Sequence, residues 1–389
     1  MVPGALATVN VTSTPGSATY DSGNGYVYVN NMNTTVRNET LHVDGFGSVS
    51  VIDGTSLVGV ATVGLVPDGS TYDSGNGYVY VVNTRSNNVS VLDGVSVIAT
   101  IPVGQDPDVS AYDSGDGYVY VTNLQSENVT VISGTTVRAT IPVGVEPGGV
   151  IYDSADGDIY VGNGVSDNLS VIRGTSVVGN ISVGASAPWP AAFDDINGCV
   201  YVLDGGSDSV SVIGGTTVLK TIPAGRGPTS AVFDAGNGFV YVSNYESENL
   251  TVLSGTSSLA TVTLNSWPGG AAYDNRNGFV YVPLVGSNQV SVVNNTSVEA
   301  TIPVGTEPDT ATFDGINGYV YVTNIESTNV SVIEPTYPAS PSGGGSSSLV
   351  YVVIGVVIAA MAVGIVIGLM RRERPPPAAV PPQPTIPGK

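Results

Sequence analysis

The chain has 389 residues, a formal net charge of −21 and only 11 Lys and Arg residues. A surface with so few cations repels phosphate backbones, which argues against nucleic-acid binding. With one His and one Cys, the chain has too few ligands for a zinc set, a haem-attachment motif or a disulfide. We therefore expect no catalytic residue, no metal and no cofactor.

The first predicted element is a strand at residues 5–12. The segment ALATVNVTSTPGSATYD from Ala5 aligns without a gap with VRATIPVGVEPGGVIYD from Val137, far along the chain. A strand of a repeating kind therefore stands at the N-terminus without the rest of its repeat.

The repeat itself is represented by YDSGNGYVYV, which begins at Tyr72. Asp, Ser, Gly and Asn favour a tight turn, and the alternation of Tyr and Val favours an extended strand. Copies begin at Tyr20, Tyr72, Tyr112, Tyr152, Phe193, Phe233, Tyr273 and Phe313. After a first interval of 52 residues, the spacing is 40 or 41. This period, with only strand patterns between turns, predicts an all-β propeller.

Four short strands make up each unit, as the unit from Pro107 illustrates. They are DVSAY, YVYVTN from Tyr118, NVTVI from Asn128 and VRATIPVG from Val137. Proline has no backbone N–H to donate, so Pro142 in the fourth segment predicts an edge strand at the outer rim. The first strand of each unit then lines the central channel.

The last unit ends at Glu334-Pro335 without a fourth strand. If residues 5–12 pair with the third strand of that unit, the ring closes and no blade keeps an open edge. The sequence thus predicts an eight-bladed β-propeller over residues 1–334, closed by its N-terminal strand.

The motif GYVYVTN, at Gly117 and again at Gly318, occurs together with segments such as VSVI and ATIPVG. In these motifs, residues 5–334 resemble the YVTN family of β-propeller repeats, which is best known from archaeal surface-layer and envelope proteins. The family commonly has seven blades, one fewer than the units counted here. The resemblance implies a non-enzymatic cell-surface protein that binds or organises envelope components. A carbohydrate- or peptide-binding receptor is the alternative, and a lactonase- or lyase-type enzyme is a third.

Two loop features carry the candidate ligand face. Residues 32–47, MNTTVRNETLHVDGFG, lengthen the loop between the second and third strands of the first unit and include His42. Such loops on a rigid scaffold are where binding variation accumulates. The loop entering each unit contains a Pro, and the residue before that Pro is taken as Trp189, Trp267, Asp106, Glu146 or Glu307 in five of the units.

Aromatic planes beside carboxylates suit sugar rings or the anchors of a protein partner, and envelope glycans or surface proteins are the expected partners. Two hypotheses stay open for the Trp side chains. They form a ligand face at one mouth of the channel, or they only fill the gaps between blades.

Other residues are interpreted as structural. The Asp that opens each turn is taken as a cap and not as a calcium ligand, because no bidentate Glu follows at the required spacing. Cys199 replaces a strand Tyr and is expected to be packed. Sequons recur before the third strand at Asn88, Asn128, Asn168, Asn249 and Asn329. We expect glycosylation at these exposed turns.

The C-terminal part predicts a membrane anchor. Residues 335–348 form a Pro, Gly and Ser-rich linker, and residues 349–370 carry no charge and are long enough to span a bilayer. Residues 371–389 form a basic, then Pro-rich tail, and its Arg cluster predicts a cytoplasmic C-terminus and an extracellular propeller. The first ten residues lack a signal-peptide pattern, so we expect a signal upstream. A tail-anchored protein facing inward is the alternative.

Overall fold

The computed structural model describes residues 4–37, 40–184 and 186–335. The predicted membrane helix at residues 349–370, the tail at 371–389 and nearly all of the linker lie outside the described residues. Within the described part of the chain, no helix is long and apolar enough to cross a membrane.

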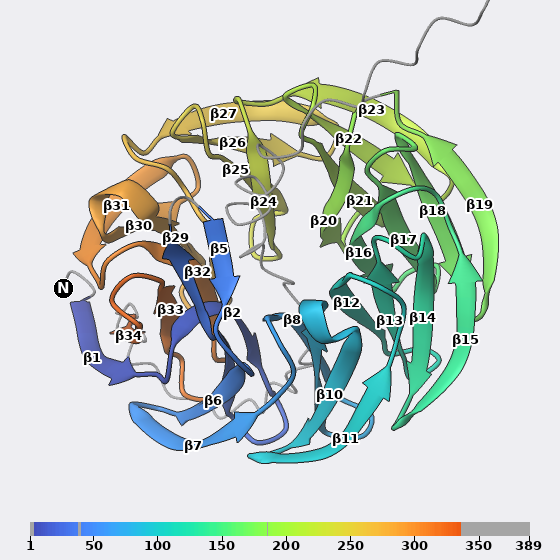
Figure 1. Cartoon of the computed structure of the whole chain (residues 1–389). Helices are drawn as coiled ribbons and strands as arrows, with labels where there is room; N and C mark the ends of the chain where they lie inside the picture. Colours follow the sequence, from blue (N-terminus) through green and yellow to red (C-terminus); the bar gives the residue numbers. More distant parts are fainter. Residues whose placement is uncertain (1–3, 38–39, 185, 336–389) are drawn as a thin grey trace, which may run out of the picture.

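Eight four-stranded antiparallel sheets are arranged in a ring around a central axis (Figure 1). We number these blades 1 to 8 in chain order of their inner strands, and their strands follow from inner to outer.

Blade 1 contains β2 (Thr14–Tyr20), β3 (Val27–Met32), β6 (Ser48–Asp53) and β7 (Ser56–Thr62). Blade 2 contains β8 (Pro67–Asp73), β9 (Tyr78–Asn83), β10 (Asn88–Asp93) and β11 (Ser96–Pro102). Blade 3 contains β12 (Pro107–Asp113), β13 (Tyr118–Asn123), β14 (Asn128–Ser133) and β15 (Thr136–Pro142). Blade 4 contains β16 (Pro147–Asp153), β17 (Asp158–Asn163), β18 (Asn168–Arg173) and β19 (Ser176–Ser182).

Blade 5 contains β20 (Pro188–Asp194), β21 (Cys199–Asp204), β22 (Ser209–Gly214) and β23 (Thr217–Pro223). Blade 6 contains β24 (Pro228–Asp234), β25 (Phe239–Asn244), β26 (Asn249–Ser254) and β27 (Ser257–Thr263). Blade 7 contains β28 (Ala272–Asp274), β29 (Phe279–Leu284), β30 (Gln289–Asn294) and β31 (Ser297–Pro303). Blade 8 contains β32 (Pro308–Phe313), β33 (Val320–Asn324), β34 (Asn329–Glu334) and β1 (Gly4–Asn10). Two 3₁₀ turns, η1 (Thr84–Ser86) and η2 (Val285–Ser287), lie in loops.

The strand order confirms the prediction from proline. In Figure 1, β8, β12 and β16 lie nearest the centre of the ring, and β11, β15 and β19 form the outer rim. Pro142 ends β15, whose side chains are mostly exposed. The missing N–H of proline therefore costs no hydrogen bond inside a sheet.

Ring closure by the N-terminal strand is also confirmed. β1 pairs antiparallel with β34, from Gly4 opposite Glu334 to Asn10 opposite Asn329. Val9 is only 5% exposed and packs in the cluster that joins blades 8 and 1. Because the last blade is completed by the first strand, the ring has no open blade, and residues 4–335 form a closed unit with its own core.

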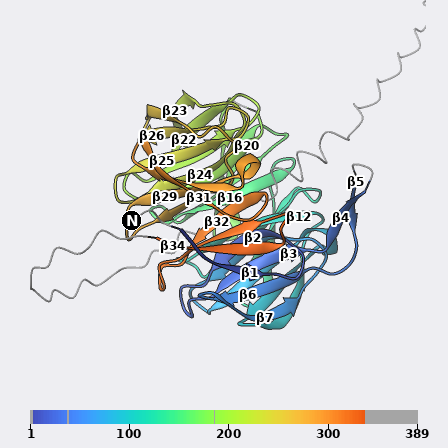
Figure 2. The same ribbon diagram turned by 90° about the vertical axis from the view of Figure 1, so that its left-hand side faces the viewer.

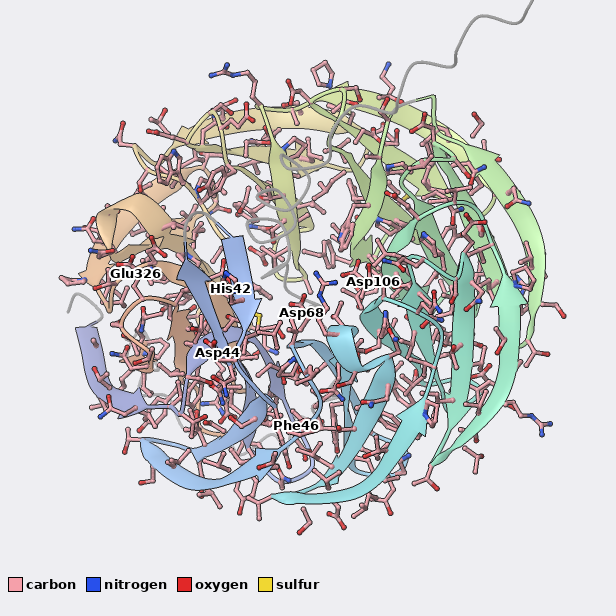
Figure 3. All side chains as sticks on the ribbon, in the orientation of Figure 1. His42, Asp44, Phe46, Asp68, Asp106 and Glu326 are labelled. Carbon is pink, nitrogen blue, oxygen red and sulfur yellow. The ribbon has the colours of Figure 1, made fainter. Side chains whose placement is uncertain are left out.

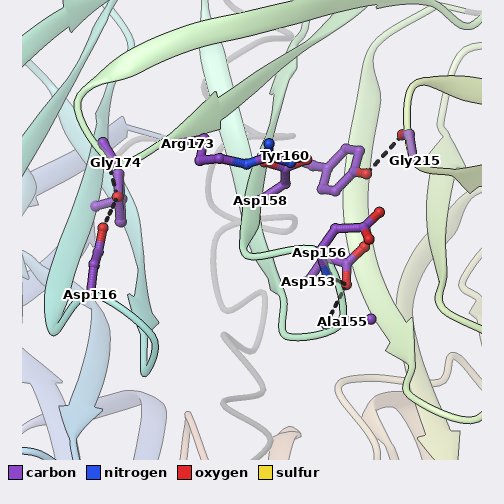
Figure 4. Close-up of polar contacts among 10 residues, drawn as sticks. Asp116, Asp153, Ala155, Asp156, Asp158, Tyr160, Arg173, Gly174 and Gly215 are labelled. Carbon is purple, nitrogen blue, oxygen red and sulfur yellow. Dashed lines mark hydrogen bonds and ion pairs between the residues drawn. The ribbon is translucent and has the colours of Figure 1, made fainter.

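Tyrosines of the second strands fill the spaces between blades. Eight of these rings are fully buried, namely Tyr28, Tyr80, Tyr120, Tyr160, Tyr201, Tyr241, Tyr281 and Tyr321. The Tyr160 hydroxyl donates to the Gly215 carbonyl of the next blade at 2.7 Å (Figure 4). Tyr80 does the same to Gly134 at 2.8 Å. Each such ring thus fixes one blade on the next, which explains why the YVYV motif recurs.

The Asp that opens each turn caps it, as predicted. In blade 4, Asp153 Oδ1 accepts the Ala155 N–H at 2.8 Å (Figure 4). These caps also join blades, because the Tyr72 hydroxyl hydrogen-bonds to the Asp21 carboxylate of the preceding blade. Burial, then the charge of Asp21, raises the pKa of Tyr72 to about 12. The repeated Tyr-Asp pair is thereby explained as an inter-blade contact.

The insertion in blade 1 forms a separate two-stranded hairpin, β4 (Thr34–Arg37) and β5 (Thr40–Val43). It lies over the inner part of the ring in Figure 1 and stands out from one face in Figure 2. This hairpin breaks the symmetry of that face.

Candidate functional site

We call the face that carries the hairpin the top face. It is built from the loops that join second to third strands and from the loops that join fourth strands to the next blade. The two kinds of loop are hydrogen-bonded to each other, for example Leu124 N–H to the Asp106 carbonyl at 3.0 Å. Figure 3 looks along the ring axis and shows His42 of the hairpin over the inner part of the ring, with Glu326 and Asp106 on opposite sides of it.

A polar clasp supports this face in most blades. The last Asn of the second strand donates from Nδ2 to the Oδ1 of the sequon Asn and to the hydroxyl two residues beyond. In blade 3, Asn123 reaches Asn128 at 2.8 Å and Thr130 at 3.0 Å. The same pairs form at Asn83, Asn163, Asn244 and Asn324. Both N–H groups of this buried side-chain amide thus meet an acceptor.

This clasp gives the sequons a structural cause. Asn128 is half-buried and begins β14, and the Thr130 hydroxyl is buried. The Asn and the hydroxyl at the two ends of the sequon are the two acceptors that Asn123 requires. The recurrence of the motif therefore follows from hairpin geometry, and glycosylation at these five positions stays a prediction.

The structure separates Trp189 from the other candidate residues. β20 begins at Pro188, as β16 begins at Pro147, so Ala187 and not Trp189 takes the position before the loop Pro. Trp189 is instead the second residue of an inner strand, half-buried against the clusters on both sides of it. Its ring lies so close to Gly148 that a Cβ there would approach it to 2.6 Å. The position of Trp189 agrees with the hypothesis that the Trp side chains fill the gaps between blades.

Trp267 lies where the sequence placed it, at a loop end on the top face. It is 44% exposed. Its ring stacks on Tyr245 of blade 6, with ring centroids 5.5 Å apart and an interplanar angle of 23°. One face of the indole is therefore supported, and much of the rest of the side chain meets solvent.

The position of Trp267 results from an interrupted inner strand. β28 is limited to Ala272–Asp274. Before it, the Gly270 N–H donates to the Asp309 carbonyl of blade 8 at 2.8 Å. A Cβ at Gly269 would overlap the same carbonyl, so only glycine permits this approach. The segment before β28 is thus hydrogen-bonded to blade 8, and Trp267 lies at the start of that segment.

Acidic groups of blade 8 adjoin this aromatic pair. The pKa of Tyr245 is raised by burial, then by the charges of Glu307 and Asp309. Burial, then the charge of Glu326, raises the pKa of Glu307. The negative potential at Tyr245 therefore comes from Glu307 and Asp309, and the negative potential at Glu307 comes from Glu326.

Asp106 and Glu146 share the position of Glu307 in their own blades. All three have a left-handed backbone, with φ of 54°, 52° and 53°, and all three are half-buried. Asp106 enters blade 3 and Glu146 enters blade 4, so neither is on a blade next to Trp267. Of the predicted set, Trp267 stacks on Tyr245, and Tyr245 is also reached by the charge of Glu307. The structure thereby adds Tyr245, and it adds Glu326, whose charge acts on Glu307.

Three buried aspartates at the channel were missed by the sequence analysis. Asp68, Asp108 and Asp309 each follow the Pro that begins an inner strand, and they are 9%, 1% and 2% exposed. Burial, then the charges of Asp108 and Asp309, raises the pKa of Asp68 well above its usual value. Burial raises the pKa of Asp309 to about 7. The recurring Pro-Asp pair was the available signal.

The other candidate residues have plain positions. His42 lies exposed on the hairpin. Cys199 is buried at the start of β21, which confirms the packed-strand interpretation. Within the described residues, no group of three His, Cys, Asp or Glu side chains is placed to hold a metal ion. A shallow pocket of about 220 Å³ lies under Phe46, between blades 1 and 2, and is lined by Ser86, Asn88 and Thr100 among others.

No protein-family model and no curated protein matches the chain. Solved propellers are similar to it in fold. Hydrazine synthase of Kuenenia stuttgartiensis aligns with 70% of this chain and 96% of its own, at 18% identity and a TM-score of 0.57. Virginiamycin B lyase of Staphylococcus aureus aligns with 69% and 95%, at 14% identity and a TM-score of 0.56. The WD40 propeller domain of Doa1 aligns with 85% and 97%, at 10% identity and a TM-score of 0.53. At these identities the likeness extends to the β-propeller fold alone.

Proposed function

We propose that the protein is a non-enzymatic, membrane-anchored cell-surface propeller that binds an envelope component through its top face. The observation that carries the proposal is Trp267, which is stacked on Tyr245 and yet 44% exposed. The charges of Glu307 and Asp309 of blade 8 act on that Tyr245 ring. A large aromatic side chain that is fixed in place and open to solvent is typical of a binding anchor.

The cellular setting of the proposal rests on sequence features. The uncharged segment at 349–370, followed by an Arg cluster, supports a single-pass anchor with the propeller outside. The YVTN motifs support membership among envelope propellers of the surface-layer type. With only 11 basic residues in the chain, an acidic exterior surface fits this setting better than a nucleic-acid partner.

A carbohydrate receptor is the second candidate. Trp267 offers a stacking surface and Glu307 offers acceptors for hydroxyl groups, which together are a common sugar-binding arrangement. A lyase-type activity has less support, because the only His lies on an exposed hairpin and no second His is present to share proton transfer.

Binding of the isolated propeller, residues 1–335, to envelopes of the source cell tests the proposal. We expect saturable binding that Trp267→Ala weakens at least about 30-fold, the equivalent of about 2 kcal/mol. Phe46→Ala removes a more exposed aromatic ring, 66% against 44%, from the same face and is the matched control. Protease-treated and glycan-stripped envelopes separate a protein partner from a glycan. Binding that is unaffected by Trp267→Ala, in a variant that melts normally, contradicts the proposal.

A further inference from the structure

We propose that Trp267 and the acids of blade 8 recognise an alkylammonium group, the head of a lysine side chain on a partner protein. This inference rests on the proposed function of the top face and names the chemistry of its ligand. It uses Trp267, Tyr245, Glu307 and Glu326, which we call the Trp267 site.

The charged groups at the Trp267 site are acidic, so the site favours a cationic ligand. The loop that carries Glu326 is bonded to Glu307 through the Ile325 N–H, 2.9 Å from the Glu307 carbonyl. The Glu307 N–H in turn donates to Asn288 Oδ1 at 3.0 Å, in the loop whose Val285 N–H donates to the Trp267 carbonyl at 2.9 Å. The charge of Glu326 acts on Glu307, and the charges of Glu307 and Asp309 act on Tyr245. No basic residue is among the charges that shift Glu307 or Tyr245 in the described part of the chain. The electrostatic free energy of two neighbouring carboxylates without a nearby cation falls most when the ligand carries a positive charge.

The whole top face has the same bias. Outside residues 32–47, the described loops of this face contain nine acidic residues, namely Asp106, Glu127, Glu146, Asp167, Asp208, Glu246, Glu248, Glu307 and Glu326. Outside the hairpin, the basic residues in these loops are Arg85 and Arg226. Such a field attracts and orients a positively charged partner before contact.

The aromatic rings of the site leave part of the Trp267 indole open. Tyr245 covers one side of the indole, and the ring edge passes close to Gly286, where an added Cβ would approach Trp267 Cε3 to 3.4 Å. The exposed part of the indole is an apolar surface on which an alkyl chain can pack. An ammonium group near the indole also gains from the negative face of the ring.

The site therefore combines an apolar plane for the methylene groups of lysine with carboxylates for its ammonium group. A neutral sugar would leave the Glu307 and Glu326 charges without compensation. A guanidinium is also cationic, but it is broader and prefers a bidentate carboxylate, whereas the carboxylates here come from two separate loops.

Titration of residues 1–335 with the peptide Gly-Gly-Lys-Gly-Gly, followed by NMR, tests the inference. Its neutral counterpart carries norleucine in place of lysine. We expect the lysine peptide to bind at least tenfold more tightly than the norleucine peptide, and high salt to reduce the difference. Trp267→Ala and Glu307→Gln should each weaken lysine binding at least tenfold. Glu127→Gln, on the same face in blade 3, should leave it unchanged, and Trp267→Phe should retain part of it.

Equal binding of the two peptides, tighter binding of N-acetylglucosamine, or lysine binding that survives Trp267→Ala overturns the inference. The outcome is separable from that of the proposed function. If Trp267→Ala loses envelope binding but the parent shows no preference for lysine, the top face is the binding face and the ligand is not an alkylammonium group. If the propeller binds the lysine peptide but not the envelopes, the site recognises an alkylammonium group and the proposed cellular role is wrong.

Discussion

Deletion of residues 1–11 is expected to lower the free energy of unfolding of the propeller by roughly 5 kcal/mol or more. The deletion removes β1, and with it the antiparallel pairing that runs from Glu334 to Asn329 along β34. It also removes Val9 from the cluster between blades 8 and 1. The last blade then exposes an unpaired edge and apolar surface at once. Urea unfolding of residues 1–335 and 12–335 gives the comparison.

Point variants serve as controls for this deletion. Val9→Ala should lower the free energy of unfolding by about 1–2 kcal/mol, because the side chain is 5% exposed. Leu6→Ala on the same strand should change it little, because Leu6 is 46% exposed. If the shortened propeller unfolds at the same urea concentration as the parent, β1 does not close the ring.

The propeller is expected to be more stable at pH 4.5 than at pH 7.5. Burial raises the pKa of Asp309 from 3.8 to about 7 and also raises that of Asp68. A carboxyl group whose pKa is higher in the folded than in the unfolded protein stabilises the folded state. This stabilisation is complete only below the pKa of the group in the unfolded protein. That contribution is lost as the pH rises from about 4 to about 7. Release of carboxylate repulsion in a chain of net charge −21 acts in the same direction.

Urea unfolding at the two pH values, in the parent and in Asp309→Asn, measures this effect. The variant should lose part of the pH dependence, because the amide cannot ionise. The Thr310 hydroxyl lowers the pKa of Asp309 and the charge of Glu307 raises it, and the charge of Asp309 in turn raises the pKa of Asp68. Asp167→Asn, in a top-face loop, is the control and should keep the parent slope. A pH dependence unchanged by Asp309→Asn would show that this carboxyl does not carry it.

The fold was predictable because the turns and strands of each unit are specified by short local sequence patterns. The turn caps at Asp153 and its equivalents, the outer strand with Pro142, and the N-terminal strand without a blade were all visible as local patterns. Each depends on the chemistry of one short segment, and the repeat shows that chemistry many times.

The site was only partly predictable, because it is made between blades. Trp189 was misaligned, since prolines stand on both sides of it and only the distance to Phe193 identifies Pro188 as the strand start. The stack of Tyr245 on Trp267 joins residues of two blades, which no pattern within one unit reveals. The sequons lie at the starts of the third strands, where the clasp around residues such as the buried Thr130 gives them a structural role, and their glycosylation stays a prediction.

The central claim is that the top face binds the partner. Hydrogen exchange of residues 1–335, measured with and without the envelope component that it retains, tests this claim most directly. We expect protection in the hairpin and in the loops at 245–248, 264–268 and 304–307, while the turns at 73–77 and 153–157 on the opposite face exchange as before. Protection confined to those opposite turns or to the outer strands would contradict the account.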